Sequence, residues 1–462
     1  MKIIKFYLDC LSAAAYIVSS NDEAIVIDPQ RDVEIYIEYL EKNRLNLKYI
    51  LETHLHADFV SGHLELANRT AAQIVFSEVA NASFDHISVV EGDQLKFGDV
   101  QVSVLETPGH TPESVCFVIK DLMDNEAELS VFTGDTLFAG DVGRPDLMDA
   151  TISKEKLATM LYHSLRDKLM SLPDNTRVYP AHGAGSSCGR ALMDVEYSTI
   201  EKEKQTNYAL QPMSIEEFIR QVTTDQPIAP TYFASSAKLN RLGLQPIDDI
   251  LNKLETLSVA DVKKLMVEVD ITLVDVRDPE IYSKQYIPGS INIGLDGRYA
   301  EWLGTVTNQD HRLIIVADPG KEREATIRAA RVGFDNVIGY LEGGFDSWIN
   351  ENEPTEYFER MNPEDLIDLS GSEEERILLD VRRPTEFKIS HLPNALNIPL
   401  SQLESNLDKL QKGKKYVVHC AGGYRSVIAS SILKRSNFKD VVDIRGGFNA
   451  FAEKSIEINH IH

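Results

Sequence analysis

The chain has few cysteines and no long apolar run. Only Cys10, Cys116, Cys188 and Cys420 occur among 462 residues, and they are widely spaced. This excludes a disulfide scaffold and fits a reducing compartment, so we expect a cytoplasmic protein. No stretch reaches the ~18 apolar residues that a membrane helix needs. Asp9 interrupts the apolar N-terminus, which is more typical of a strand, a turn and a second strand than of a signal peptide.

Positive charge is also scarce. The chain has 47 Lys and Arg residues against 72 Asp and Glu residues, a net charge of −25. Phosphate backbones and anionic membranes would repel such a chain, so we expect neither a nucleic-acid nor a membrane partner. An anionic ligand must therefore be held by local donors or by a metal. At roughly 100–200 residues per domain, the length predicts about three domains.

The first half alternates short apolar runs with helical patterns, which favours a layered α/β fold. Helical periodicity occurs at Asp32–Asn43 and Ser153–Leu169, and a proline-containing connector is predicted at Gln226–Asp249. Apolar runs typical of strands lie at residues 14–18, 24–28, 49–53, 73–77, 102–108, 115–119 and 129–135.

His and Asp residues collect where these apolar runs end. The segment THLHADFVSGH (Thr53–His63) follows one run, and PGHTPES, FTGDTLF and YPAHGAG follow others. Side chains at strand ends can converge at one edge of a layered fold, and mixed His/Asp sites suit Zn, Mn or Fe(II). The candidate metal-site residues are His54, His56, Asp58, His110, Asp135 and His182.

Over about residues 1–245 these motifs resemble the metallo-β-lactamase-fold signature, which implies an αββα sandwich. Within that superfamily, GDVGRPDL (Gly140–Leu147) and HGAGSSCG (His182–Gly189) are similar to persulfide dioxygenases rather than to glyoxalase II. Phe59 stands where the common pattern has a further His, and an apolar ring cannot ligate a second metal.

The resemblance implies one Fe(II) per chain, held by His54, His110 and Asp135 as a facial triad, with Zn as the alternative metal. Three further residues then orient these ligands, donate to bound water and substrate, or ligate directly: His56, Asp58 and His182.

Two residues nearby are candidates for the substrate pocket. Arg144 either forms a buried ion pair with Asp146 or contacts the substrate. Cys188 follows His182 by six residues in a Gly/Ser-rich loop, so we expect it at the mouth of the pocket. Its thiol either carries sulfane sulfur or fills a tight turn.

The second half contains an internal repeat of about 100 residues, which indicates two tandem copies of one α/β domain. We therefore predict domains at residues 1–250, 251–358 and 359–462. The matching segments are 271–293 with 377–399, 313–324 with 416–427, and 340–348 with 443–451.

Cys420 ends an apolar strand, and a short glycine-containing loop leads from it to a helix beginning near Ser426. The glycines let backbone N–H groups point at the sulfur. The helix N-terminus and Arg425 add positive charge, which favours the reactive thiolate. The loop residues expected to cradle a persulfide are Ala421, Gly422, Gly423, Tyr424 and Ser426.

CAGGYRS, with DVRRPTEF upstream and RGGF downstream, resembles a rhodanese domain over roughly residues 360–462. The resemblance implies a parallel-sheet α/β domain in which Cys420 accepts sulfane sulfur, with Arg425 beside it. In the first repeat we align Asp318 with this cysteine. A carboxylate cannot form a persulfide, so this copy is expected to lack sulfurtransferase activity.

Together the resemblances imply an enzyme that oxidises a low-molecular-weight persulfide (RSSH) with O₂ to sulfite. Cys420 then transfers sulfane sulfur to sulfite, giving thiosulfate, or acts in reverse, as part of sulfide detoxification. The carrier thiol is of the glutathione, coenzyme A or bacillithiol type, and a homo-oligomer is expected. The alternative enzyme is a glyoxalase II-like zinc thioester hydrolase with accessory rhodanese domains. In a non-catalytic alternative, the two repeats are interaction modules that sense sulfide or redox state. The intact CAGGYRS loop disfavours this alternative.

Overall fold

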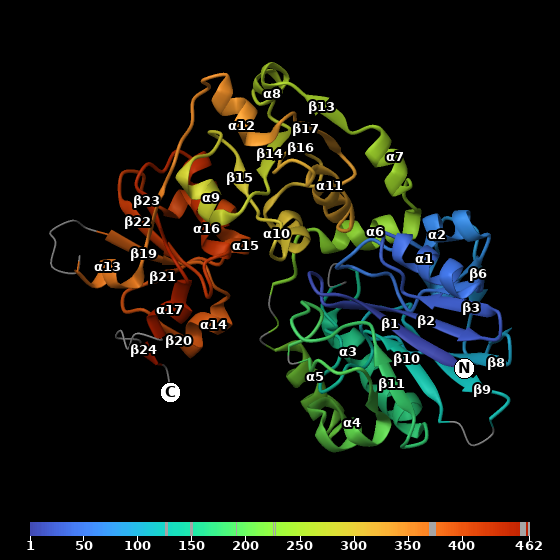
Figure 1. The fold of residues 1–462 in the computed structure, drawn as a ribbon. Coiled ribbons are helices and arrows are strands. Elements are labelled where there is room, and N and C mark those ends of the chain that lie inside the picture. Colours follow the sequence, from blue (N-terminus) through green and yellow to red (C-terminus); the bar gives the residue numbers. More distant parts are fainter. Residues whose placement is uncertain are drawn as a thin grey trace. The chain divides into compact units, whose positions relative to one another are not determined.

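The computed structural model describes residues 1–124, 128–147, 151–190, 192–224, 226, 228–368, 376–452 and 459–460. The chain divides into two compact units, residues 1–249 with 330–333, and residues 250–329 with 334–462. Figure 1 shows both, coloured along the sequence. Within the described part of the chain, no helix has the length and apolar character needed to cross a membrane.

The first unit contains two six-stranded sheets, each with its strands in sequence order. The first sheet is β1 (Lys2–Leu8), β2 (Ala13–Ser20), β3 (Glu23–Ile27), β4 (Asn46–Leu51), β5 (Gln73–Ser77) and β6 (Ile87–Val89). The second is β7 (Gln94–Phe97), β8 (Val100–Glu106), β9 (Val115–Asp121), β10 (Ser130–Gly134), β11 (Arg177–Pro180) and β12 (Ser198–Thr199).

Helices cover the outer faces of these sheets, so the unit has four layers in the order αββα. Residues of α1 and α2 pack with the first sheet in one apolar cluster, and residues of α3 and α5 pack with the second sheet in another. The helices are α1 (Glu34–Asn43), α2 (His63–Thr70), α3 (Lys154–His163), α4 (Ile200–Thr206), α5 (Ile215–Thr223), α6 (Phe233–Leu242) and α7 (Ile247–Asn252), the last crossing into the second unit.

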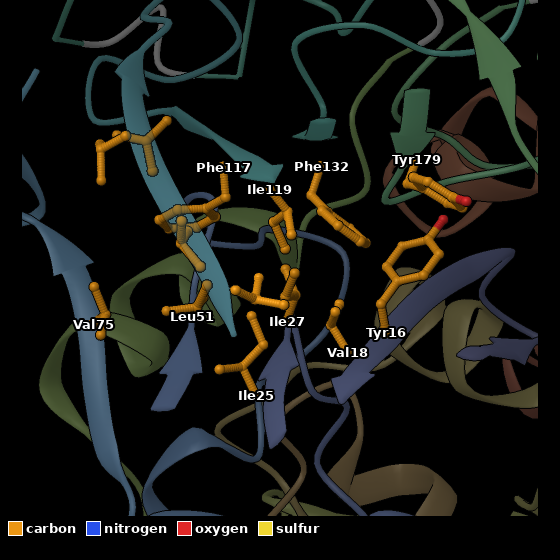
Figure 2. Packing of buried hydrophobic residues seen from close by; sticks show 14 of the residues in the cluster. Tyr16, Val18, Ile25, Ile27, Leu51, Val75, Phe117, Ile119, Phe132 and Tyr179 are labelled. Carbon is orange, nitrogen blue, oxygen red and sulfur yellow. The ribbon is translucent and has the colours of Figure 1, made fainter. Parts of the chain in front are cut away.

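The main core lies between the two sheets (Figure 2). Tyr16 of the first sheet meets Phe132 of the second edge-on, at a ring-centroid distance of 5.0 Å, and Phe132 stacks on Tyr179. The Tyr16 hydroxyl donates to the Pro180 carbonyl at 2.6 Å, which satisfies this buried polar group. Because β2 contacts helices on one face and the second sheet on the other, all of its residues are buried.

The elements expected in the first half are present. The seven apolar runs fall on β2, β3, β4, β5, β8, β9 and β10, and the two helical patterns on α1 and α3. The Ser153 hydroxyl caps α3 by accepting from the backbone N–H of Lys156. The predicted connector contains the helix α6, which its weak periodicity did not indicate.

The second unit contains two five-stranded parallel sheets with equivalent strand orders. The first is β13 (Glu255–Leu257), β17 (Val337–Leu341), β16 (Arg312–Val316), β14 (Ile271–Asp275) and β15 (Ile291–Asn292). The second is β18 (Glu359–Met361), β23 (Val441–Ile444), β22 (Lys415–His419), β19 (Arg376–Asp380) and β21 (Leu396–Asn397). A two-stranded pair joins β20 (Ser390–His391) to β24 (Asn459–His460).

The helices of the second unit follow the same repeat. Those of the first repeat are α8 (Val259–Leu265), α9 (Pro279–Lys284), α10 (Tyr299–Val306), α11 (Glu322–Ala330) and α12 (Gly344–Asn350). Those of the second are α13 (Pro363–Asp368), α14 (Pro384–Ile389), α15 (Leu400–Leu403), α16 (Arg425–Arg435) and α17 (Gly447–Ala452).

Side-chain contacts confirm that the two repeats share one fold. Arg277 forms a buried ion pair with Asp275 at 2.6 Å, and Arg382 forms the same pair with Asp380, also at 2.6 Å. In the second repeat, the Asn397 amide donates to the carbonyls of both members of its pair, as the equivalent asparagine does in the first. These contacts fix the end of β14 and of β19 to the strand that follows.

The strand register corrects one alignment made from the sequence. Asp275 pairs with Val316, and Asp380 pairs with His419, so Val316 and His419 are equivalent. The residue equivalent to Cys420 is therefore Ala317, and Asp318 lies one position further on. The segments matched in sequence, 313–324 and 416–427, pair the same two positions, so the Asp318 alignment was one residue off. The methyl group of Ala317, like a carboxylate, cannot accept sulfur, so the first repeat is still expected to lack sulfurtransferase activity.

Candidate metal centre and cysteine site

Three of the candidate metal-site residues converge after different strands of the first unit. His54 follows β4, His110 follows β8, and Asp135 directly follows β10. Asp135 Oδ2 lies 3.4 Å from His110 Nε2 and 3.9 Å from His54 Nε2. All three side chains are buried.

The atoms that face one another are the ones a metal would need. His54 Nε2, His110 Nε2 and Asp135 Oδ2 have no hydrogen-bond partner among the described residues. Buried polar atoms without partners are costly, and a bound cation would satisfy all three together. Two imidazoles and one carboxylate suit Zn or Fe(II), so this donor set fits a metal ion.

Hydrogen bonds on the far side of each ring set the tautomers. The Thr53 hydroxyl donates to Asp28 Oδ2 at 2.8 Å, so its oxygen accepts from His54 Nδ1 at 3.0 Å. His110 Nδ1 donates to the Arg144 carbonyl at 2.9 Å. Both rings then carry their proton on Nδ1 and present the Nε2 lone pair to the centre.

His182 lies between two carboxylates. Its Nδ1 is 2.7 Å from Asp135 Oδ1, and its Nε2 is 2.8 Å from Asp58 Oδ2. Burial lowers the pKa of His182, but Asp135 and Asp58 raise it by more than burial lowers it. The pKa of His182 therefore lies well above the ordinary value. With both nitrogens donating, His182 orients the free oxygen of Asp135 toward His54 and His110.

His56 faces away from the three converging atoms. Its Nε2 lies 3.1 Å from Asp28 Oδ1 and 3.5 Å from Glu52 Oε2, and its ring stacks on Phe59 at a centroid distance of 4.3 Å. Burial lowers the pKa of His56, but Asp28 and Glu52 raise it to about 9. Sequence reasoning missed Asp28 and Glu52, although both lie at the ends of apolar runs.

Arg144 and Cys188 are placed more deeply than pocket residues would be. Arg144 is 2% exposed and forms the anticipated ion pair with Asp146, with contacts of 2.6 and 2.8 Å. Cys188 was expected at the pocket mouth, but it is 1% exposed and groups with Asp58 and His182. Burial, together with the nearby carboxylates, raises its pKa well above the ordinary value, so the thiol stays protonated. The Gly/Ser-rich loop folds inward because the Arg144 N–H donates to the Cys188 carbonyl.

The connector helix α6 holds the metal-site loop in place. The Asn240 amide donates to the carbonyls of His56 and Phe59, both at 2.8 Å. Its oxygen accepts from the Ser61 N–H at 2.8 Å. Asn240 is buried, and it is about 180 residues from the loop in sequence, so no local pattern marked it.

A cavity of about 260 Å³ lies beside this loop. Leu55 and Ala57, which alternate with the candidate metal-site residues, line it together with Thr111, which follows His110. Its other wall includes Lys238 and Arg241 of α6. Most of the lining is apolar; its charged residues are Lys238, Arg241 and Glu113, whose carboxylate accepts from the Leu55 N–H.

Cys420 lies directly after β22 and is 1% exposed. The Gly423 N–H donates to Cys420 Sγ at 3.1 Å, and Sγ lies 3.6 Å from Ser426 Oγ. Gly423 has a φ of +89°, which favours glycine, and Gly422 before it is exposed. The loop therefore brings a backbone donor to the sulfur, as the sequence predicts.

Arg425 is not a free cation beside the thiol. It forms a two-pronged ion pair with Glu386, both contacts at 2.7 Å. Burial lowers the pKa of Arg425, while Glu386 and the Cys420 sulfur raise it, for a net rise. The carbonyls of Cys420 and Ala421 accept N–H donors from α17, which ties the loop to that helix.

Comparisons with known proteins identify the families of both parts of the chain. Residues 8–182 match the metallo-beta-lactamase superfamily, and residues 258–351 and 362–454 each match the rhodanese-like domain. The mitochondrial persulfide dioxygenase ETHE1 of Mus musculus is 33% identical over 204 residues, covering 43% of this chain and 70% of that protein.

Two other proteins are similar to this chain at about 31% sequence identity. A hydroxyacylglutathione hydrolase of Francisella philomiragia is 31% identical over 210 residues, covering 45% of this chain and 76% of that protein. A crystal structure described as a metallo-beta-lactamase from Staphylococcus aureus is 31% identical with a TM-score of 0.67, covering 74% of this chain and 99% of that one. Persulfide dioxygenase similarity and rhodanese domains together support an enzyme of sulfur metabolism. The chain thus belongs to the metallo-β-lactamase superfamily, as a domain related to persulfide dioxygenases joined to two rhodanese-like domains.

Proposed function

We propose that the first unit is a persulfide dioxygenase with one Fe(II) and that Cys420 is a sulfurtransferase site. The observation that carries the first half is the trio of buried, unpartnered atoms on His54, His110 and Asp135, found among the described residues. Two imidazoles and one carboxylate leave coordination positions free, as in non-haem Fe(II) oxygenases. Iron held there would supply the activation of O₂ that side chains alone do not provide.

The surrounding residues support one metal rather than two. The Phe59 ring has no ligand atom and is occupied in stacking on His56. Asp58 Oδ2 and His182 Nε2 are bonded to each other at 2.8 Å, although Asp58 Oδ1 has no hydrogen-bond partner among the described residues. A second ion bound through His182 would have to break this buried pair.

The cavity beside the loop is the proposed site for the carrier of the persulfide. Its apolar wall suits the carbon chain of a low-molecular-weight thiol, and Lys238 and Arg241 suit an anionic end such as a carboxylate or a phosphate. The chain is otherwise strongly acidic, so these cations supply the local attraction that an anionic substrate needs.

The proposed reaction is RSSH + O₂ + H₂O → RSH + SO₃²⁻ + 2H⁺. The outer sulfur is oxidised, O₂ is reduced, and the bond between the two sulfurs breaks. The protein binds the carrier, holds His54 and His110 in the tautomer that exposes Nε2, and keeps Asp135 ionised beside His182. Burial raises the pKa of Asp135, but the three histidines lower it more, for a large net fall.

Sulfur transfer is proposed at Cys420. Its thiolate attacks the outer sulfur of a second persulfide, the S–S bond of RSSH breaks, and RS⁻ leaves and takes up the proton. Sulfite then attacks the outer sulfur of the Cys420 persulfide, giving thiosulfate and restoring the thiolate. The Gly423 N–H and the Ser426 hydroxyl lie where they can donate to the sulfur anion. The reverse direction uses the same contacts.

The test is oxygen uptake by the Fe(II)-loaded full chain with glutathione persulfide, with sulfite and thiosulfate measured together. We expect His110→Ala to abolish uptake, whereas His163→Ala, at an exposed histidine, leaves it unchanged. Cys420→Ser should keep uptake and shift the product from thiosulfate to sulfite, and Cys10→Ser should not. Loss of uptake in Cys420→Ser would show that the two reactions are not divided between the sites in this way.

The second candidate is a zinc thioester hydrolase, favoured by the hydroxyacylglutathione hydrolase similarity. Metal analysis separates the two. About one iron per chain supports the dioxygenase, and two zinc ions with thioester hydrolysis and no oxygen uptake support the hydrolase.

A further inference from the structure

Tyr424, the residue after Gly423 in the Cys420 loop, is held by the first repeat. Its hydroxyl donates to the Gly294 carbonyl at 2.7 Å. A Cβ added to Gly297 would lie 2.4 Å from the Tyr424 ring, so the ring rests on the Gly297 backbone. The repeat that lacks a catalytic cysteine thus contacts the active loop of the repeat that has one.

Glu280 makes a second connection between the repeats. It lies in the first turn of α9, and its carboxylate accepts from Arg360 at 2.8 Å and from Arg445 at 2.7 Å. Both arginines belong to the second repeat. Arg445 also donates to the Arg360 carbonyl, which closes a compact ion cluster across the junction.

Arg360 carries this connection to the sulfur. Its Nε donates to the buried Asp443 at 2.7 Å, and its Nη2 reaches the Gly423 carbonyl at 3.4 Å. Gly423 is also the residue whose N–H donates to Cys420 Sγ. Glu280 is therefore linked to the sulfur through Arg360 and Gly423, with the Arg360 side chain only 8% exposed.

Cys420 and Ala421 are tied to α17 through their carbonyls, but the two glycines that follow need support from other contacts. Gly422 and Gly423 have no side chains to pack, and glycine-containing loops gain conformational freedom when unsupported. An anion cradle is effective only if its donor is held in place before the anion forms. Contacts from a neighbouring, rigid domain supply this.

We propose that the cysteine-less repeat positions the Cys420 loop, with Glu280 and the turn Gly294–Gly297 as positioning elements. The inference rests on the proposed transfer role of Cys420 for its biological meaning. Its test uses only the reactivity of the thiol, so the two proposals can fail separately.

Electrostatics alone predicts the opposite result for Glu280. Removing its negative charge would leave Arg360 and Arg445 less compensated near the sulfur, which would favour the thiolate and speed its reactions. Positioning predicts slower reactions, because Arg360 would no longer be held against Gly423. The sign of the effect in Glu280→Gln therefore separates the two explanations.

The experiment measures alkylation of Cys420 by iodoacetamide in the full chain, followed on the Cys420 peptide by mass spectrometry between pH 6 and 9. In Glu280→Gln and Tyr424→Phe we expect alkylation at pH 7 to slow about threefold or more, with the half-maximal rate displaced upward by about half a pH unit. Glu268→Gln is the matched control, since it removes the exposed ion pair with Arg312 in the same repeat. It should react at the wild-type rate.

Gly297→Ala is the second test, because it adds one methyl group in the first repeat, against the Tyr424 ring. We expect it to slow alkylation as Tyr424→Phe does. Wild-type rates in both Glu280→Gln and Gly297→Ala, or a faster rate in Glu280→Gln, would overturn the proposal. Slower alkylation in a protein that forms no thiosulfate would support positioning and refute the transfer role of Cys420.

Discussion

Replacing Thr53 by valine tests whether hydrogen bonds from Asp28 through Thr53 orient His54 for metal binding. The substitution keeps the shape of the side chain and removes one hydroxyl, which donates to Asp28 and accepts from His54 Nδ1. Asp28 keeps its bond from the Thr53 backbone N–H at 2.8 Å, so the loop itself stays anchored. The change therefore falls mainly on the tautomer and orientation of His54.

The expected magnitude follows from that single lost partner. Removing a hydrogen-bond partner of a metal-ligating histidine typically weakens metal binding by about 10–100-fold, equivalent to about 1.4–2.7 kcal/mol. We expect Thr53→Val to lose Zn(II) affinity within this range, measured by competition between the metal-free protein and a chromogenic chelator.

Thr176→Val is the matched control. Thr176 is also fully buried, and its hydroxyl has no hydrogen-bond partner in the described structure, so the same substitution removes no contact. Wild-type affinity in Thr53→Val would refute the argument that Asp28 and Thr53 set the His54 tautomer. A loss of similar size in Thr176→Val would show that the effect is not specific.

Three further predictions concern α6, the cavity and the second unit. Asn240→Ala leaves three buried backbone groups unpaired and should destabilise the first unit by about 2–4 kcal/mol, measured by far-UV circular dichroism in urea. Lys238→Ala and Arg241→Ala should raise the KM for glutathione persulfide and keep kcat, whereas the exposed Lys202→Ala should change neither. Burial raises the pKa of Asp443 to about 6, against about 3.9 in an unfolded chain, so folding favours its protonated form. The stability that the protonated Asp443 contributes is therefore lost as pH rises from about 4 through 6. Over this pH window the Tm of the second unit should fall in the wild type, and it should fall less in Asp443→Asn. Both tryptophans lie in that unit, so their fluorescence reports it.

Much of the metal centre was predictable from sequence because its residues end apolar runs. His54, His110 and Asp135 each follow a strand, and strand ends meet at the edge of a layered fold. The supporting residues were not predictable in the same way. Asn240 comes from a connector with weak periodicity, and its contacts span about 180 residues, which only the folded chain brings together.

The repeats show a similar division. Shared motifs such as Asp275–Arg277 and Asp380–Arg382 predicted one fold twice, and the strand orders confirm it. The equivalent of Cys420 is Ala317, as the matched segments 313–324 and 416–427 imply and the strand register confirms; the Asp318 alignment was one residue off. The burial of Cys188 was missed because a glycine- and serine-rich stretch has no apolar pattern to mark it as interior. The domain boundaries at 250 and 358 stay predictions.

The support that α6 gives to the metal-site loop has a consequence for biogenesis. A nascent chain that has reached Asp135 already contains the three candidate ligands, but it lacks the amide that fixes the carbonyls of His56 and Phe59. That amide arrives with Asn240, about a hundred residues later, when the connector has left the ribosome. Since a domain generally folds as a unit once it has emerged from the ribosome, we expect a well-ordered metal site only late in translation. Ribosome-bound chains that end before α6 should consequently hold metal less tightly than chains that include it.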